Sequence, residues 1–408
     1  TSGADAPAFI GGLAETNFSE ALLTSVGAEP EFSARLAAMR KMWSRYITEI
    51  KDRDSGGDMT MAEAKRLQSE LAEATINAAL AVTLAELEAR SLAGSSGAAS
   101  SPSNMQKGSR PETLGLAVLA LGKLGARGLD YGSDLDLVIV YDNAPRASNG
   151  LTNTEYYSRA VEIFLNVLSS VTRNGTLYRV DLRLRPYGSK GLPAIPDEVF
   201  LKYMSESAAI WEMLAFVNLR AVGGSAALGS RVEQSTRRII HERAAALDTS
   251  ELAAETRRVR LALEKQHCRA GRGAEVDIKY GAGGMLDIYF AVRYLQLLGP
   301  VIDYSSDRST QLILDRLAAD GSLAAYHSSL PALALGYKFL SGLDHTLRLV
   351  VGRTPRLPAA DHPALDEITR RMGCDSGASL IEQLTFHRLA VREAFNAILD
   401  ATDRPTAR

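Results

Sequence analysis

Cysteine is scarce in this chain of 408 residues, which contains only Cys268 and Cys374. Two cysteines so far apart have neither the spacing of a zinc site nor the density of a disulfide scaffold, so we expect a reducing, cytoplasmic location. Histidine is also rare, with six residues, and no pair has metal-ligand spacing. We therefore expect His267 and His345 to have structural roles.

Long apolar runs and a strong net charge are absent as well. No run reaches about 18 apolar residues, which excludes a membrane-spanning helix. The net charge of −2 gives no reason to expect nucleic acid as a partner. The first residues, TSGADAPAF, lack the basic start and the apolar core of a secretory signal. Because an initiator Met is missing too, we expect a chain that was processed or cut from a longer protein.

The composition is that of a globular protein, with 46% hydrophobic and 23% charged residues. The length exceeds that of one ordinary core, so we expect two or three domains. Residues 1–91 predict a helical segment, in which Thr60 and Glu63 have the spacing of a capping box. Residues 92–111 are rich in Ser, Gly and Ala and predict a linker.

Residues 112–225 predict a small domain with a mixed sheet. Two apolar runs predict buried strands, and in a third segment the alternation of polar and apolar residues predicts another strand. The three segments are Leu114–Leu121, Leu135–Tyr141 and Leu177–Leu184. Thr152 and Glu155 form a second capping box, which opens a helix that ends near Val171.

Helical patterns return from residue 232 to 408 and predict a helical bundle. The fold class that we expect is therefore α+β: a mixed sheet flanked by an N-terminal helical segment and a C-terminal helical bundle.

The most informative segment is L-G-K-L-G-A-R-G-L-D-Y-G-S-D-L-D, which ends at Asp136. A tight turn around Gly125 follows the first strand, and Asp134 and Asp136 open the second. Residues i and i+2 of a strand point to the same face, roughly 6.5–7 Å apart at Cα. Asp181 lies on the polar face of the third strand, so three carboxylates converge if that strand lies beside the second. They are the hard oxygen ligands that Mg²⁺ prefers, and they suit a two-metal site.

Such a site suits nucleotidyl transfer, because metal ions lower the pKa of an attacking hydroxyl and neutralise a leaving pyrophosphate. The glycines let phosphate approach backbone N–H groups, and Arg183 and Arg185 can pair with phosphates. A lone D-x-D is more often a turn or surface feature, but the glycine turn and Asp181 favour the functional interpretation. The chain has no G-x-x-x-x-G-K-[ST] loop, and the glycines at 281–284 lack the last glycine of a dinucleotide fingerprint.

Four blocks of sequence resemble the glutamine synthetase adenylyltransferases, the bifunctional adenylylating and deadenylylating enzymes. The order and spacing of the blocks match, and the resemblance extends from about Leu71 to the C-terminus. The blocks are G-K-L-G-A-R-G-L-D-Y-G-S-D-L-D-L (122–137), V-D-L-R-L-R-P-Y-G (180–188), W-E-M-L-A-F-V-N-L-R (211–220) and D-I-K-Y-G-A-G-G-M-L-D-I-Y-F (277–290).

This resemblance implies a nucleotidyltransferase domain of the DNA polymerase β-like superfamily and a helical domain, together one half of a full-length member. It implies ATP and Mg²⁺ as cofactors and glutamine synthetase as the protein substrate, with AMP transferred to a tyrosine or removed by phosphorolysis. A PII signal protein and glutamine are the implied regulators. Asp134, Asp136 and Asp181 match the family's metal-binding aspartates, and Gly125 matches its phosphate-approaching turn.

Several residues are candidates to bind the nucleotide, and some of them have a structural alternative. Lys279 contacts a phosphate or is a solvated loop lysine. Ser133 bonds a phosphate or caps its turn, and Asp287 has a functional role or simply favours its helix dipole. The full set of binding candidates is Gly122, Lys123, Gly125, Ser133, Arg183, Arg185, Lys279 and Asp287. Trp211, Glu212 and Arg220 match a block that lies near the site in the family.

The chain departs from the family's pattern at four positions. Gly128 and Tyr289 stand where the family has Glu, Asn218 where it has a basic residue, and Arg293 where it has Gln. The loss of an acid at Tyr289 weakens metal or nucleotide positioning or marks a diverged copy.

Features of both halves of the family occur, so the direction of transfer stays open, with a slight preference for adenylylation. The D-I-K-Y-G-A-G-G block is more similar to the adenylylating half, and Y-R-V-D at 178–181 to the removing half. Two alternatives also remain: a nucleotidyltransferase of the same fold with another substrate, and a regulatory module that senses nucleotide.

Overall fold

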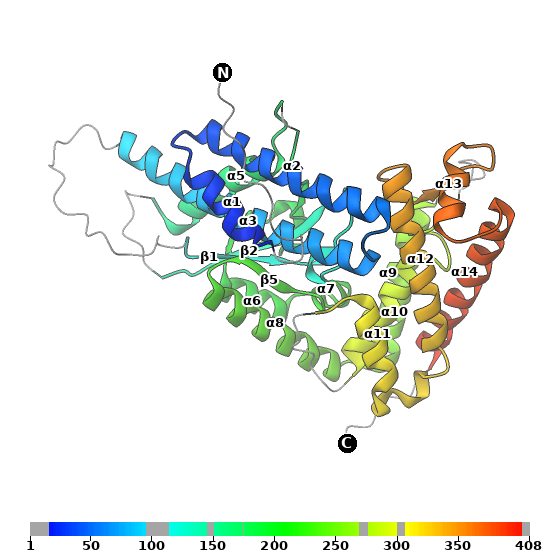
Figure 1. The fold of residues 1–408 in the computed structure, drawn as a ribbon. Coiled ribbons are helices and arrows are strands. Elements are labelled where there is room, and N and C mark those ends of the chain that lie inside the picture. Colours follow the sequence, from blue (N-terminus) through cyan, green and yellow to red (C-terminus); the bar gives the residue numbers. More distant parts are fainter. Residues whose placement is uncertain are drawn as a thin grey trace.

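The computed structural model describes residues 16–94, 114–144, 151–173, 175–268, 276–299 and 307–401. Most of the predicted linker at 92–111 lies outside these ranges. The described chain is mainly helical and contains a small mixed sheet, which confirms the α+β class (Figure 1). Within the described ranges, none of the helices is both long enough and apolar enough to cross a membrane.

Three helices form the N-terminal segment: α1 (Phe18–Gly27), α2 (Phe32–Gly56) and α3 (Met61–Gly94). The predicted capping box precedes α3, with the Thr60 N–H donating to Glu63 at 2.8 Å and the Glu63 N–H donating to the Thr60 hydroxyl at 3.2 Å. Each bond satisfies a backbone donor that the first helical turn leaves free. The helix continues to Gly94 and so includes the first residues of the predicted linker.

The sheet contains five strands: β1 (Leu116–Ala120), β2 (Leu135–Tyr141), β3 (Val180–Asp181), β4 (Ile195–Pro196) and β5 (Arg220–Gly224). Their order is β3-β2-β1-β5, and β4 also pairs with β2. The β1 strand is antiparallel to both β2 and β5, whereas β3 and β4 run parallel to β2. The sheet is therefore mixed, as predicted.

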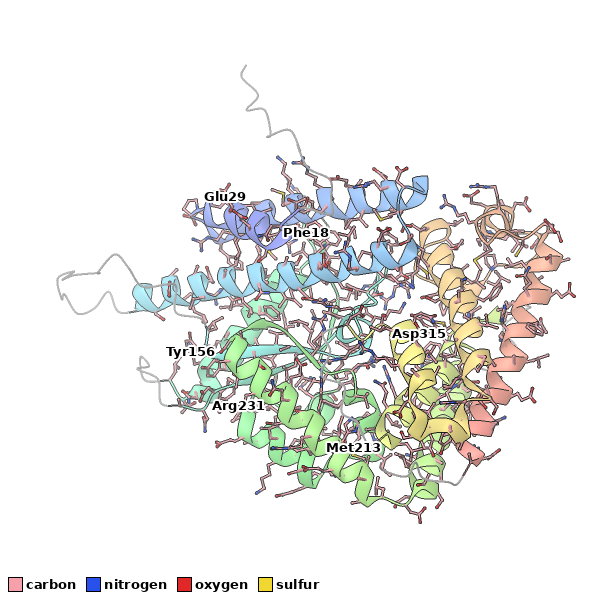
Figure 2. The ribbon with its side chains drawn as sticks, turned by 60° about the horizontal axis from the view of Figure 1, so that its bottom comes forward. Phe18, Glu29, Tyr156, Met213, Arg231 and Asp315 are labelled. Atoms are coloured by element: carbon pink, nitrogen blue, oxygen red, sulfur yellow. The ribbon has the colours of Figure 1, made fainter. Side chains whose placement is uncertain are left out.

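Helices cover both faces of the sheet. The helices α3 and α5 (Asn153–Ser169) pack on one face, and α6 (Asp197–Glu206), α7 (Ile210–Phe216) and α8 (Ala226–Ala246) lie on the other (Figure 1). In Figure 2, Phe18 of α1 lies on the side of the sheet that α3 and α5 cover, and Met213 of α7 lies on the opposite side. Every residue of β1 is buried because both of its faces are covered, which explains its unbroken apolar sequence.

The third strand is much shorter than predicted, since only Val180 and Asp181 of the segment Leu177–Leu184 pair with β2. The carboxylate of Asp181 accepts the backbone N–H of Arg183 at 2.8 Å. An Asp side chain that bonds the backbone two residues ahead favours a turn over a strand. Side-chain alternation ends there, because Leu184 packs into the opposite core cluster from Val180.

The C-terminal helices are α9 (Thr249–His267), α10 (Met285–Leu298), α11 (Thr310–Ala319), α12 (Leu330–Val350), α13 (Ala364–Arg371) and α14 (Gly377–Asp400). A short pair of strands, β6 (Val276–Asp277) and β7 (Arg356–Leu357), joins two of their connections. Helix α8 begins at Ala226, earlier than the predicted bundle, and packs against the sheet. One apolar core runs from that face of the sheet into the bundle.

Candidate active site

Two of the predicted aspartates lie side by side at the start of β2. Asp136 and Asp181 are paired in register across the parallel strands β2 and β3, whose backbones are about 4.8 Å apart. Burial and then the negative charge of Asp181 raise the pKa of Asp136 to about 6. The structure therefore brings together two carboxylates that repel each other, and a cation between them would relieve that repulsion.

The third aspartate, Asp134, pairs with Arg353 from the loop after α12. Its Oδ2 accepts a hydrogen bond from the Arg353 guanidinium, while the buried Oδ1 has no hydrogen-bond partner among the described residues. Asp181 is also held by a cation, because the Arg183 guanidinium lies 2.6 Å from its Oδ2 and lowers its pKa. Within the described ranges, no group of three or more His, Cys, Asp or Glu side chains is placed to hold a metal ion.

Of the two glycines predicted to serve phosphate, only Gly122 lies against the carboxylates. Its φ is +56°, and a Cβ at this position would lie 2.2 Å from Oδ2 of Asp136. Gly125 is buried below the turn, where a Cβ would lie 2.3 Å from the carbonyl oxygen of Asn218. Arg220 supports the same turn by donating to the carbonyl groups of Leu124 and Gly125. Gly125 thus serves close packing of the turn.

A cavity of about 220 Å³ opens beside Asp136, between the sheet and the bundle. Four predicted site residues line it: Gly122, Lys123, Asp136 and Lys279. The Lys123 ammonium is 2.8 Å from Asp344 of α12, and burial lowers its pKa. Lys279 and Arg293 add positive charge that favours the ionised form of Asp136.

A family model described as glutamate-ammonia ligase adenylyltransferase matches residues 12–235, more than half of the chain. The chain belongs to this family. A second model, described as GlnD PII-uridylyltransferase, matches residues 256–399, which form most of the helical bundle.

Curated relatives of this adenylyltransferase family are about 30% identical to the chain over the aligned residues. A bifunctional glutamine synthetase adenylyltransferase/adenylyl-removing enzyme of Ralstonia nicotianae is 30% identical over 92% of this chain and 40% of the relative. Proteins of the same name from Methylococcus capsulatus and Mesorhizobium japonicum are each 31% identical, over 71% and 73% of this chain and 30% of each relative. The chain spans well under half the length of these relatives.

The four residues that depart from the adenylyltransferase pattern all line this cavity: Gly128, Asn218, Tyr289 and Arg293. Tyr289 faces Tyr337 with ring centroids 6.4 Å apart, and the Arg293 guanidinium lies 6.0 Å from the Tyr289 ring. The changes at 289 and 293 therefore place an aromatic ring and a cation in the wall beside Asp136.

Three binding candidates have other partners in the structure. Asp287 is fully buried and pairs with Arg260 of α9 and Arg392 of α14, away from the cavity lining. Ser133 accepts the Asp130 N–H at 3.3 Å and closes its own turn. The Arg185 guanidinium is bound to backbone carbonyl groups of its own loop. All three thus make structural contacts, and none of them lines the cavity.

Sequence reasoning missed a buried charge network behind the site, centred on His345 of α12. Its ring nitrogens lie 3.0 Å from Asp130 and 3.0 Å from Asp54, and Lys65 lies 3.5 Å from Asp130. Burial alone would lower the pKa of His345, but the bonds to both aspartates raise it to about 9. The same cations hold the pKa of Asp130 far below its usual range. The position of Asp130 in the D-Y-G-S-D sequence was the only sequence pattern that indicated a place near the site. No local pattern indicated that Asp54, His345 or Arg353 lies there.

Proposed function

We propose that this chain transfers an adenylyl group between a nucleotide and a tyrosine of glutamine synthetase, on a polymerase β-like nucleotidyltransferase fold. The observation that carries the proposal is the pairing of Asp136 and Asp181 across parallel strands, beside a cavity lined with basic residues. Family membership and the names of the relatives support the choice of substrate.

Mg²⁺ is the metal that fits these residues. Asp134, Asp136 and Asp181 offer only carboxylate oxygens, which hard cations prefer. Burial and the charge of Asp181 raise the pKa of Asp136, and the buried Oδ1 of Asp134 has no hydrogen-bond partner among the described residues; a bound metal ion would satisfy both groups. When bound, the metal would lower the pKa of the attacking hydroxyl and neutralise phosphate charge. Arg353 and Arg183 occupy two of the three carboxylates and would have to move aside.

The cavity supplies the groups that a nucleotide phosphate requires. Lys279 and Arg293 line it, and within the described part of the chain neither forms an ion pair. Gly122, at its positive φ, brings the backbone of the turn next to Asp136. A phosphate in this cavity would thus meet two cations on one side and the carboxylates on the other.

The same proposal includes a regulator, a division into domains and a cellular location. A PII signal protein is the proposed regulator, and the match of the bundle to a model described as a PII-uridylyltransferase supports it. The division into a helical segment, a nucleotidyltransferase domain and a bundle is kept as predicted. Two free thiols fit a reducing, cytoplasmic location.

Mass spectrometry of glutamine synthetase tests the function. The chain is incubated with unmodified substrate, ATP and Mg²⁺, and separately with adenylylated substrate and phosphate. The loss-of-function control is Asp134→Asn/Asp136→Asn. Asp142→Asn is the matched control, because Asp142 directly follows β2 at its other end.

A gain of AMP on a tyrosine identifies the adenylylating direction, and loss of AMP with formation of ADP identifies the removing direction. Either activity should vanish in the double variant and persist in Asp142→Asn. No change in either substrate, with ATP still bound in the presence of Mg²⁺, would refute the proposed function and favour a regulatory role.

A further inference from the structure

The loop that follows β3, residues 182–192, leads from the wall of the cavity to the surface. Leu184 lines the cavity at the base of the loop. The Arg185 guanidinium fixes the loop from inside by donating to three of its backbone carbonyl groups at 2.8 to 3.3 Å. A loop ordered in this way presents its outer side chains with little further loss of conformational entropy on binding.

An aromatic residue stands at the outer end of this loop. Tyr187 is 69% exposed and has a φ of 63°, a left-handed conformation that bulky residues rarely adopt. Its ring packs edge-on against Tyr203 of α6 with the centroids 5.3 Å apart, and the Tyr203 hydroxyl donates to Glu212 at 2.7 Å. The exposed ring is therefore held in place, and such local strain is concentrated at functional positions.

A second exposed aromatic residue lies directly before Glu212, which accepts the hydrogen bond from the Tyr203 hydroxyl. Trp211 precedes Glu212 in α7 and is 37% exposed, and Leu192 at the end of the loop is also exposed. Tyr, Trp and Arg are the residue types most enriched where proteins bind one another. Exposed apolar side chains gathered beside a catalytic site therefore indicate a contact surface for a protein.

The charge of this surface is positive. Within residues 182–192 the exposed basic side chains are Arg183 and Lys190, and no acidic residue occurs. Before the loop, Arg179 is also exposed, and Asp181 is paired with Arg183. An acidic partner would be attracted to this surface and a basic one repelled.

We propose that residues 182–192, with Trp211, form the docking surface for an acidic protein segment that carries the reacting tyrosine. The proposal rests on the proposed function, in which a protein tyrosine is the adenylyl acceptor or donor. The base of the loop adjoins Asp136, so a segment that lies across the loop has its tyrosine within reach of the carboxylates. The cavity remains available for the nucleotide.

Fluorescence anisotropy of two labelled peptides tests the surface directly. One peptide carries a central Tyr flanked by Glu and Leu, and the other has Lys in place of each Glu. Tyr187→Asn removes the ring and keeps a residue that tolerates the left-handed backbone, and Lys190→Glu reverses a charge. The matched controls are Phe386→Gln on α14, where the ring is 66% exposed, and Lys51→Glu on α2.

We expect the wild-type protein to prefer the acidic peptide. Tyr187→Asn and Lys190→Glu should each weaken its binding about five- to tenfold, whereas the controls should stay within about twofold. Equal binding of both peptides, or no effect of either loop variant, would overturn the docking surface.

Kinetics with glutamine synthetase separate this proposal from the proposed function. The loop variants should raise KM for glutamine synthetase by similar factors, while binding of ATP with Mg²⁺ is unchanged. Wild-type activity with an unaltered KM in both loop variants overturns the docking surface and leaves the function intact. A wild-type protein that transfers no AMP in either direction overturns the function, and the peptide preference then decides the surface alone.

Discussion

The ion pair between Arg353 and Asp134 competes with a metal ion for one of the three candidate ligands. Replacing Arg353 by Ala removes that competition and leaves Asp134 directly before β2. Both side chains are about one-third exposed, at 38% and 34%, so solvent screens the pair. Pairs of this kind are worth at most about 1 kcal/mol. We therefore expect Arg353→Ala to tighten divalent metal binding by about two- to fivefold.

The assay is the titration of free Mn²⁺ by electron paramagnetic resonance, which reports metal binding without catalysis. Lys51→Ala, an exposed cation on α2, is the matched control and should bind Mn²⁺ as the wild type does. Asp134→Asn should lose affinity with or without Arg353. Unchanged or weaker Mn²⁺ binding by Arg353→Ala would refute the reasoning, because the arginine would then not compete with the metal or would hold Asp134 in its ligand position.

Three further predictions follow from the contacts of single residues. Gly122→Ala places a Cβ 2.2 Å from the Asp136 carboxylate and should abolish transfer with the fold retained. A Cβ at Gly128 would lie 3.9 Å from the Lys123 carbonyl oxygen, so Gly128→Ala should remain active; equal transfer rates of the two variants would contradict this. Asp287→Ala removes one of the two carboxylates paired with the buried Arg260 guanidinium, and Glu264 remains. We expect the free energy of unfolding in urea titrations to fall by about 2–3 kcal/mol, whereas a loss of nucleotide binding at unchanged stability would favour the functional role of Asp287. Because the pKa of His345 is raised to about 9, its protonation should add on the order of 3 kcal/mol to the free energy of unfolding. This contribution is complete below pH about 6.5 and is lost as the pH rises towards 9. In urea titrations at several pH values, His345→Gln should remove this pH dependence, and an unchanged dependence would argue against the network.

Strands and helices with a strong periodic pattern could be predicted closely from the sequence. The run Leu135–Tyr141 is β2 without change, because its apolar side chains are buried on both faces. The alternation at Leu177–Leu184 was misleading, since the side chain of Asp181 turns the backbone after only two paired residues. Local periodicity does not reveal which polar side chain will bond its own backbone.

Only part of the candidate site could be predicted, because local sequence patterns do not reveal contacts between distant segments. A spacing of two along one strand and the position of Asp181 were enough to suggest neighbouring carboxylates, and the register of β2 with β3 confirms that two of them adjoin. Contacts between distant segments were beyond local patterns: Arg353 reaches Asp134 over more than 200 residues. The two glycines of the turn also look alike in sequence, and only the packing shows that Gly122 faces the carboxylate while Gly125 is buried.

The network around His345 bears on how this protein can be divided. Asp54 comes from α2, Asp130 from the loop before β2, and His345 from α12, and all three are buried. A fragment cut at the limits of the sheet would leave Asp130 without Lys65 and His345, in the loop that carries Asp134 and leads into β2. The smallest unit suited to enzymology or to transplantation into another protein therefore includes α2, α3 and α12 together with the sheet.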